Sequence, residues 1–280
     1  MDIAHLRQWI GRTETTEDVA SPGQVAGLAA LLDHAIPPWT SGELPPLAHW
    51  LYFLTRAPQS EIGEDGHPRR GGFLPPVTLP RRMWAGSRVA FRTPIEIGML
   101  MTRQSTIMDV REKSGATGEM VFVTVRHEIA TAMGTVLTEE QDIVYREAPK
   151  SPPALPPRTA QPGPRGGHAR RIVPDPTQLF RFSALTFNAH RIHYDREYCR
   201  DVEGYPGLVV QGPFTAMLLM DHFLRSNPAA GVTQFEYRAQ RPLYDIAPFD
   251  LCLAATNTGA DLWALDAHGE KAVVARVSTA

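Results

Sequence analysis

The residues best suited to chemistry lie in one short stretch, FSALTFNAHRIHYD, which runs from Phe182 to Asp195. It holds two histidines, an asparagine, an arginine and an aspartate between aromatic and aliphatic residues. Burying polar groups of this kind costs free energy unless they line a pocket or find partners. Histidine titrates near neutral pH and can give or take a proton. The stretch therefore predicts a pocket in which acid–base chemistry takes place.

A second feature follows in the segment 205–213, YPGLVVQGP. Its apolar run leads into Gly212 and Pro213, and proline is favoured at the first position of a helix. The start of a helix offers unpaired N–H groups and the positive end of the helix dipole. The segment therefore predicts a helix N-terminus that can stabilise a developing negative charge.

Several kinds of site are excluded by what the chain lacks. It contains no GxxxxGK[ST] loop, no GxSxG nucleophile elbow and no HExxH motif, and its Gly163, Gly166 and Gly167 follow prolines instead of a strand. His190 and His193 are three residues apart, but the carboxylates near them form no metal-ligand pattern. We therefore expect no nucleotide-phosphate loop, no serine hydrolase or zinc protease, and no metal site.

Length and composition exclude further classes. The 280 residues suffice for one large domain or two smaller ones with self-supporting cores. The 28 Lys and Arg residues nearly balance the 30 Asp and Glu residues, so no basic field is available to hold nucleic acid. Two cysteines are too few for a disulfide framework. With no apolar run of about 18 residues and no signal-like N-terminus, we expect a cytoplasmic protein that binds neither nucleic acid nor membrane.

Proline and glycine divide the chain into two parts. The segment 150–167 is rich in both residues and lacks the apolar periodicity found on either side. This predicts a linker at 150–167 between an N-terminal domain at 1–149 and a C-terminal domain at 168–280. A long surface loop within one domain is the alternative interpretation.

Both parts show a helix followed by a series of strands. Apolar residues at helical spacing predict helices at 24–33 and 212–224. Val-, Ile- and Thr-rich stretches between turn residues predict strands at about 88–94, 98–112, 119–129 and 134–145, and again at about 233–241, 249–257, 261–267 and 271–279. The repeated order indicates a tandem duplication. We expect an α+β fold in which each unit curls an antiparallel sheet around a helix.

The two segments described first resemble a known family. FSALTFNAHRIHYD followed by GLVVQGPF is similar to the signature of the MaoC-like (R)-specific enoyl-CoA hydratases and dehydratases. The stretch DGHPRRGGFLPPVTLPRRMWAG at 65–86 and VFVTVRHEI at 121–129 resemble the fatty-acid-synthase-type dehydratase domain that precedes it in double hot dog members. The resemblance implies two hot dog units, each a long helix wrapped by a curved antiparallel sheet, with the catalytic motif in the C-terminal unit.

The motif departs from the family pattern at one important position. The family's usual form is GDxNPxH, and aligning His193 with the motif histidine places Asn188 at the acid–base aspartate. An amide cannot exchange a proton near neutral pH, so Asn188 can only orient water or the thioester. His193 is then the leading acid–base residue, with His190 or Asp195 as a second member. The backbone N–H of Gly212 resembles the family's thioester-oxygen donor.

The resemblance also implies a reaction and a substrate class. It predicts a hydro-lyase that adds water to a 2-enoyl-CoA, with mesaconyl-C4-CoA or itaconyl-CoA giving citramalyl-CoA. CoA is part of the substrate, so no cofactor is expected, and a homodimer is expected because hot dog units usually associate. We expect Arg191 to bind the distal carboxylate. Further candidates for substrate binding are Tyr194, Gln211, Arg81 and Arg82.

Three other activities remain open at this stage. A dehydratase of fatty 3-hydroxyacyl thioesters would require an apolar end to the acyl tunnel. A thioesterase of the same architecture would release a free thiol. A non-catalytic acyl-CoA-binding subunit would bind the thioester without turnover, which the substitution at Asn188 makes worth testing.

Overall fold

The computed structural model describes residues 2–115, 118–147 and 168–280, so the linker predicted at 150–167 lies outside the described residues. Elements of the first half are α1 (Ile3–Arg7), β1 (Thr13–Val19), α2 (Pro22–Leu31), η1 (Ala48–Leu51), η2 (Gln59–Glu61), β2 (Arg81–Phe91), β3 (Leu100–Gly115), β4 (Gly118–Thr131) and β5 (Gly134–Arg146). The second half has β6 (His168–Ile172), α3 (Pro176–Leu185), η3 (Arg191–His193), α4 (Arg196–Asp201), α5 (Gly212–Ser226), β7 (Val232–Ala239), β8 (Phe249–Thr256), β9 (Gly259–Leu265) and β10 (Lys271–Thr279).

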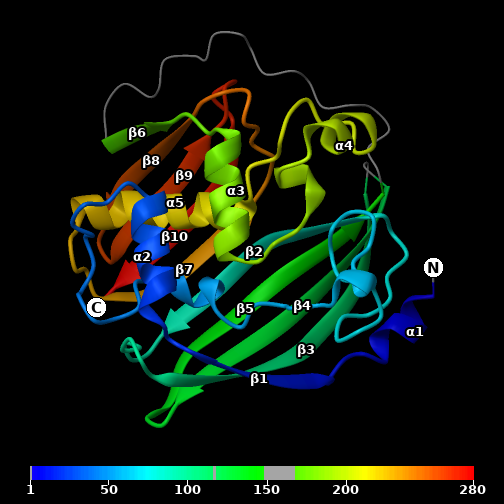
Figure 1. Cartoon of the computed structure of the whole chain (residues 1–280), viewed down its shortest axis with the longest axis horizontal. Helices are drawn as coiled ribbons and strands as arrows, with labels where there is room; N and C mark the ends of the chain where they lie inside the picture. Colours follow the sequence, from blue (N-terminus) through cyan, green and yellow to red (C-terminus); the bar gives the residue numbers. More distant parts are fainter. Residues whose placement is uncertain (1, 116–117, 148–167) are drawn as a thin grey trace.

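Within the described residues, ten strands form one antiparallel sheet in the order β1-β3-β4-β5-β2-β7-β10-β9-β8-β6. The halves join through the neighbouring strands β2 and β7 (Figure 1). In this pairing Ser87 lies opposite Tyr237. Read from its outer edge, the N-terminal half has the order β1-β3-β4-β5-β2, and the C-terminal half has the order β6-β8-β9-β10-β7. Each strand of the first half therefore has an equivalent in the second, and the halves meet at the equivalent strands β2 and β7. This symmetry supports the tandem duplication that the sequence indicates and agrees with the predicted α+β architecture.

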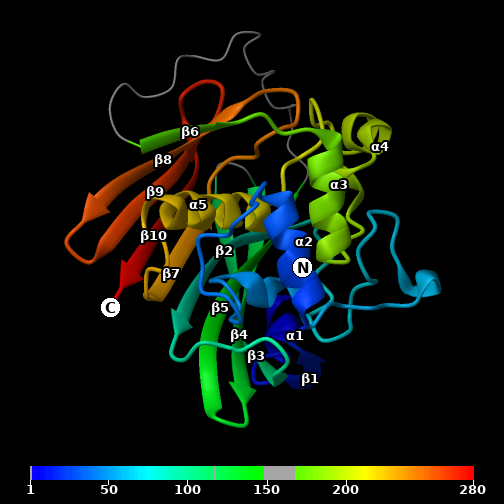
Figure 2. The ribbon, with the colours of Figure 1, turned by 60° about the vertical axis from the view of Figure 1, so that its left-hand side comes forward.

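Helix α5 fills the concave side of the C-terminal half. It contacts β8, β9 and β10, and Figure 2 shows it crossing those strands. Pro213 stands in its first turn, as the sequence predicts. All residues from Phe214 to Leu224 are buried, including the polar Thr215, Asp221 and His222, so the protein encloses this part of the helix on every side. No helix among the described residues is long and apolar enough to cross a membrane.

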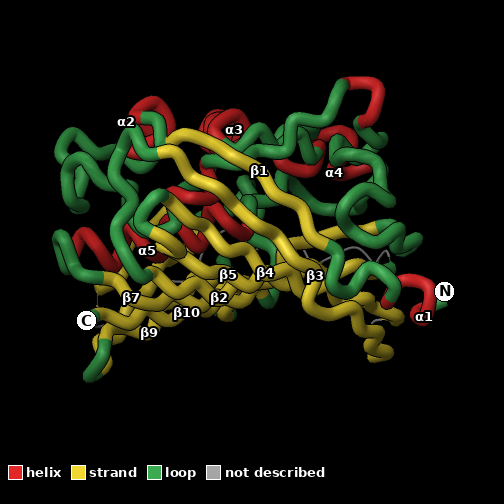
Figure 3. The backbone as a smooth tube through the Cα atoms, turned by 90° about the horizontal axis from the view of Figure 1, so that it is seen from below, coloured by secondary structure: helices red, strands yellow, loops and turns green. Residues whose placement is uncertain are grey.

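The N-terminal half differs from this arrangement. Its helix forms close to the predicted place, but α2 packs against α3 and η1 instead of lying on the sheet as α5 does; the short α1 contacts the sheet at β3. The helices and long loops gather on one side of the sheet (Figure 3). Strand β2 begins at Arg81, seven residues before the predicted start at about residue 88. The earlier start was missed because two arginines and the preceding prolines obscure the apolar alternation of the strand. Strands β3 to β5 and β7 to β10 begin and end close to their predicted limits, whereas the edge strands β1 and β6 were not predicted.

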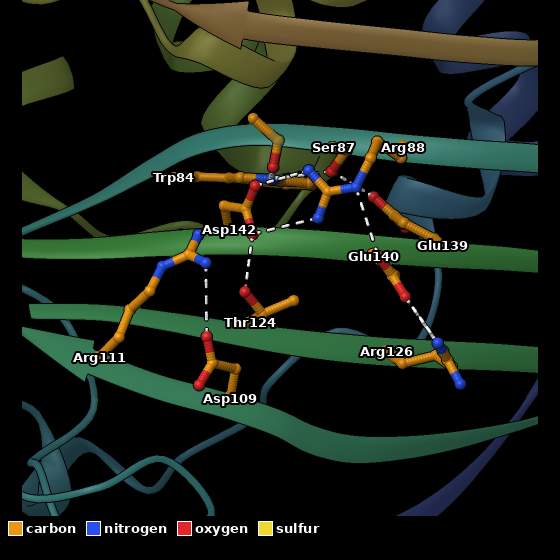
Figure 4. A network of polar contacts seen from close by, with 11 residues as sticks. Trp84, Ser87, Arg88, Asp109, Arg111, Thr124, Arg126, Glu139, Glu140 and Asp142 are labelled. Atoms are coloured by element: carbon orange, nitrogen blue, oxygen red, sulfur yellow. Dashed lines mark hydrogen bonds and ion pairs between the residues drawn. The ribbon is translucent and has the colours of Figure 1, made fainter.

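A buried polar group lies under η1, and we call it the Glu139 cluster. The Glu139 carboxylate accepts hydrogen bonds from Trp50 Nε1 at 3.0 Å and Ser87 Oγ at 2.6 Å and contacts His49 Nε2 at 3.0 Å. Glu140, the next residue, points to the opposite face and pairs with Arg126 (Figure 4). The period of two along a strand thus separates a sealed carboxylate from a solvated one.

Candidate active site

His193 lies at the end of η3, in the loop that joins α3 to α4, and it is buried. Its Nδ1 lies 2.7 Å from the carbonyl oxygen of Val209, just before α5. A carbonyl only accepts, so Nδ1 must bear the hydrogen, which leaves Nε2 with its lone pair. The backbone of the second predicted segment thus sets the tautomer of the histidine in the first and makes Nε2 a proton acceptor.

His190 lies beside His193, with ring centroids 5.2 Å apart and the rings nearly perpendicular. Asn188 determines the course of this loop, since its Oδ1 accepts a hydrogen bond from the His190 backbone N–H at 3.0 Å. This is the Asx-type turn that favours asparagine in loops. The Asn188 side chain therefore positions His190 in this structure, at the place where the family motif has an aspartate.

The N-terminal half contributes a third histidine. His67 contacts His190, with ring centroids 4.0 Å apart and the ring planes tilted by 41°. Its Nδ1 lies 3.0 Å from Asp65 Oδ2, and its backbone N–H donates to Asp65 Oδ1 at 2.9 Å. A carboxylate that accepts from Nδ1–H orients the imidazole and stabilises its protonated form, leaving Nε2 as a base. The Asp65–His67 pair is thus a carboxylate–imidazole unit at the point where the sequence signature lacks its aspartate.

The turn that holds Asp65 is fitted closely to the histidine loop. The backbone N–H of Arg191 donates to the Asp65 carbonyl at 2.9 Å, and its guanidinium donates to the Glu64 carbonyl at 3.2 Å. Gly66 has φ +88°, and a Cβ at this position would lie 1.8 Å from the Ala189 carbonyl oxygen. Only glycine allows this close approach, so the loops from the two halves meet backbone to backbone.

Burial and hydrogen bonding set the protonation states of the site. Burial lowers the pKa of His193 to about 4, and burial beside His67 and His193 lowers that of His190 much further. Burial also lowers the pKa of His67, although the hydrogen bond to Asp65 opposes it. Burial would raise the pKa of Asp65, but hydrogen bonds and charge from His67 outweigh this and hold it at about 2. At neutral pH the site therefore contains three neutral imidazoles and one carboxylate.

Asp65, His67 and His190 also offer three ligand atoms that lie within 4.8 Å of one another. Two histidines and a carboxylate can hold a transition metal with open positions. However, the 3.0 Å separation between Asp65 and His67 is that of a direct hydrogen bond, which already engages His67 Nδ1 and Asp65 Oδ2. The arrangement is accounted for as an acid–base unit, and the expectation that the site holds no metal stays a prediction.

A crevice of about 570 Å³ opens beside the Asp65–His67 pair and is lined by several arginines. Arg81 is engaged by Glu203, with Nε 3.0 Å from its carboxylate, and lies over the Tyr205 ring. Arg82 hydrogen-bonds Tyr145 and, within the described ranges, has no ion pair. The two arginines predicted to bind substrate thus differ, since only Arg82 keeps its charge available.

The remaining predicted residues lie around this centre. Gly212 is the first residue of α5, and no hydrogen bond from its N–H is found in the described part of the chain. Gln211 is buried, and its Nε2 donates to Leu179 O and Ser183 Oγ, both on α3, at 3.0 Å. The Tyr194 hydroxyl donates to the Ala189 carbonyl at 3.1 Å.

Arg191 has its guanidinium paired with Asp195 at 2.7 Å, over the ring of Tyr198. Its charge is therefore already balanced within its own loop.

Sequence reasoning missed Asp65 and His67. They lie within the stretch 65–86 that resembles an N-terminal dehydratase domain, but nothing in their local spacing connects them with the motif more than a hundred residues later. The available signal was chemical: an Asp-Gly-His turn offers a carboxylate two residues before an imidazole, while the main motif lacked a carboxylate at Asn188.

Comparison with known proteins groups this chain with thioester enzymes. A family model described as hydroxyacyl-thioester dehydratase type 2 matches residues 47–245, which include both loops of the site. The chain is 47% identical over 278 residues to a mesaconyl-C(4)-CoA hydratase of Chloroflexus aurantiacus, with 99% of each sequence covered.

Solved structures agree in fold. A MaoC-like dehydratase matches with a TM-score of 0.71 and 16% identity over 98% of this chain and 99% of its own. A Mycobacterium tuberculosis protein described as having a double hot dog fold matches with a TM-score of 0.57 and 14% identity, covering 96% of each chain. These structures support the double hot dog architecture, in which α5 is the long central helix.

Proposed function

The chain belongs to the hydroxyacyl-thioester dehydratase type 2 family, and from this premise we propose that it is an acyl-CoA hydratase that adds water across a 2-enoyl thioester. The observation that supports the proposal most directly is the Asp65–His67 pair facing His190 and His193 across the junction of the two halves. Hydration requires a base for water, an acid for the α-carbon and a donor for the thioester oxygen. Each function has a candidate group here.

In the proposed reaction, His67 Nε2 takes a proton from water while the water oxygen bonds to the β-carbon. Asp65 stabilises the imidazolium, which then gives the proton to the α-carbon as the enolate collapses. His193 Nε2 accepts a hydrogen bond from the same water and orients it, since its Nδ1–H is held by Val209. Atoms and charge balance over the cycle, because the proton taken from water is the proton added to carbon.

The thioester oxygen gains negative charge as water adds. We propose that the backbone N–H of Gly212 stabilises this charge, aided by the positive end of the α5 dipole. Neither the proposed proton transfer nor this stabilisation needs a cofactor, since CoA is part of the substrate.

The proposed substrate is mesaconyl-C4-CoA, with itaconyl-CoA as a further candidate and citramalyl-CoA as product. Support comes from the C. aurantiacus relative, which aligns along nearly the whole chain. The family description favours a second candidate, dehydration of a 3-hydroxyacyl thioester, which is the same chemistry run in reverse. We also propose a cytoplasmic homodimer, which size-exclusion chromatography with light scattering would test.

The test is turnover followed by mass spectrometry with mesaconyl-C4-CoA, itaconyl-CoA and crotonyl-CoA. Gain of one water on a dicarboxylyl thioester is expected from the wild-type protein. His67→Gln and His193→Gln should each lower kcat by about 10²-fold or more. The matched control is His268→Gln, an exposed hairpin histidine, which should leave kcat unchanged.

Two outcomes would contradict the hydratase proposal, and a third would contradict the proposed substrate. Intact thioesters throughout would favour a binding subunit, and release of free CoA would favour a thioesterase. Reaction confined to crotonyl-CoA and longer apolar chains would favour a fatty acyl dehydratase.

A further inference from the structure

Arg82 is placed where it can act on the bound acyl group. It is the second residue of β2, opposite Tyr145 of β5, and its side chain hydrogen-bonds that tyrosine. It lines the same crevice as Asp65 and His67, and it is half-buried. Its charge acts on both of those groups and on His190. Arg82 is thus a cation at the edge of the proposed acid–base site.

The neighbouring arginines differ from Arg82 because the protein already uses their charges or donors. Arg81 pairs with Glu203, and Arg191 pairs with Asp195. Arg70 donates to the carbonyl oxygens of Val77 and Pro80, both at 2.6 Å. Arg82 has no carboxylate partner among the described residues, although a half-buried guanidinium normally pairs with an anion. A ligand carboxylate would complete the site.

The proposed substrate has such a carboxylate at a defined place. In mesaconyl-C4-CoA the free carboxylate is bonded directly to the β-carbon, which is the atom that water attacks. A base positioned over the β-carbon therefore lies close to this carboxylate, and the Asp65 carboxylate lies just behind the base. Two carboxylates in one crevice repel each other unless a cation lies near both. A guanidinium also matches a carboxylate in a bidentate geometry that fixes its orientation.

We infer that Arg82 binds the free carboxylate on the β-carbon of the acyl group and so selects dicarboxylyl over monocarboxylyl thioesters. This inference rests on the proposed function and assigns its specificity to one residue. A fatty acyl chain would place a methylene group where the carboxylate lies. The same guanidinium would then discriminate against that chain, because its charge would stay unpaired beside an apolar group.

Binding of two saturated thioesters tests this assignment without requiring turnover. Succinyl-CoA has a carboxylate on its β-carbon, butyryl-CoA has a methyl group there, and both have the same CoA moiety. Calorimetric titration should show that Arg82→Gln raises the Kd for succinyl-CoA on the order of 10²-fold and does not raise the Kd for butyryl-CoA. Arg69→Gln is the matched control, since Arg69 lines the same crevice but is exposed. It should change neither Kd.

The alternatives give distinct results. If Arg82 instead contacts the phosphates of CoA, Arg82→Gln will weaken both ligands equally, and the inference is overturned. Unchanged binding of succinyl-CoA would overturn it as well. Arg82→Lys keeps the charge but loses the fork, so partial recovery of succinyl-CoA binding is expected, and this variant replaces Arg82→Gln if the latter does not fold. Failure of the proposed function would show separately, as absent hydration of mesaconyl-C4-CoA by the wild-type protein.

Discussion

Two carboxylate–imidazole pairs in this molecule have the same separation and very different surroundings. His67 and Asp65 are 3.0 Å apart, as are His49 and Glu139. The side chains of His67 and Asp65 are 20% and 28% exposed, whereas those of His49 and Glu139 are 4% and 2% exposed. The first pair opens onto a crevice, whereas Glu139 of the second lies buried between η1 and the sheet, and its partner His49 lies on the wall of a different cavity.

The two carboxylates also differ in how many donors surround them. Glu139 receives Trp50 and Ser87 in addition to His49, so its oxygens are saturated within the protein. Within the described ranges, the Asp65 carboxylate is hydrogen-bonded only by His67 of its own turn, and His67 Nε2 has no hydrogen bond. A saturated buried pair holds a structure together, whereas a pair with one open atom can exchange a proton with a ligand. Surroundings, more than the pair itself, decide the role.

The largest effect expected from this comparison is on catalysis. Asp65→Asn keeps the shape of the turn but removes the charge that stabilises the His67 imidazolium. We expect kcat to fall by about 10²- to 10⁴-fold while the midpoint of thermal unfolding changes little. Steady-state turnover of mesaconyl-C4-CoA and calorimetry measure the two quantities. A large loss of stability with unchanged kcat in the folded fraction would show that Asp65 is structural.

The same change at the second pair should act on stability. Glu139→Gln leaves Trp50, Ser87 and His49 facing an amide whose NH₂ group cannot accept their hydrogen bonds. Removing one member of a buried polar group costs on the order of 3 kcal/mol of unfolding free energy. Urea unfolding measures this cost. A fall in kcat equal to that of Asp65→Asn, at full stability, would remove the distinction drawn between the pairs.

The sequence predicted regular elements well and the composite site only in part. Helix α5 and strands such as β4 follow from local periodicity, and both were expected within a few residues of their observed limits. The place of α2 was not predictable in this way, because packing against α3 instead of the sheet depends on the shape of another part of the chain.

The site shows the same limit. His190 and His193 lie where the motif places them, but the partner of this motif is Glu64 to His67, in a loop without periodicity. Arg191 contacts Glu64 across 127 residues of sequence, and Gly66 fits against Ala189 through its backbone. A fit between two loops depends on the assembled fold, and no spacing along the chain encodes it.

The lowered pKa values of the imidazoles should appear in the pH dependence of activity. With the pKa of His193 lowered to about 4 and that of His67 lowered below its usual 6.5, both imidazoles are neutral and able to accept protons at neutral pH. We therefore expect kcat/KM to stay level as the pH falls from 8 to 7 and to reach half its plateau value below pH 6.5. An unshifted histidine would instead halve activity near pH 6.5.

The free energy of unfolding should also fall as the pH is lowered from 6.5 to 4. Burial lowers the pKa of His127, near the Glu139 cluster, to about 4, as it does for His193. The unfolded chain binds protons first, so stability present above pH 6.5 is lost as the pH falls through 4. Brief acid assays followed by return to pH 7 separate the effects. Activity that recovers immediately reports protonation of the site, and activity that stays lost reports unfolding.

The smallest effect is expected for substitution of Glu140, although its neighbour Glu139 should give the largest loss of unfolding free energy. Glu140 follows Glu139 on β5 but points to the opposite face, where it pairs with Arg126 at 2.7 Å and Arg88 at 3.3 Å (Figure 4). Its side chain is 33% exposed, so water screens these pairs and replaces them when they break. Glu140→Gln should therefore cost below about 1 kcal/mol by urea unfolding. A cost equal to that of Glu139→Gln would mean that charge anywhere on this strand matters, and that burial is not what separates the two pairs.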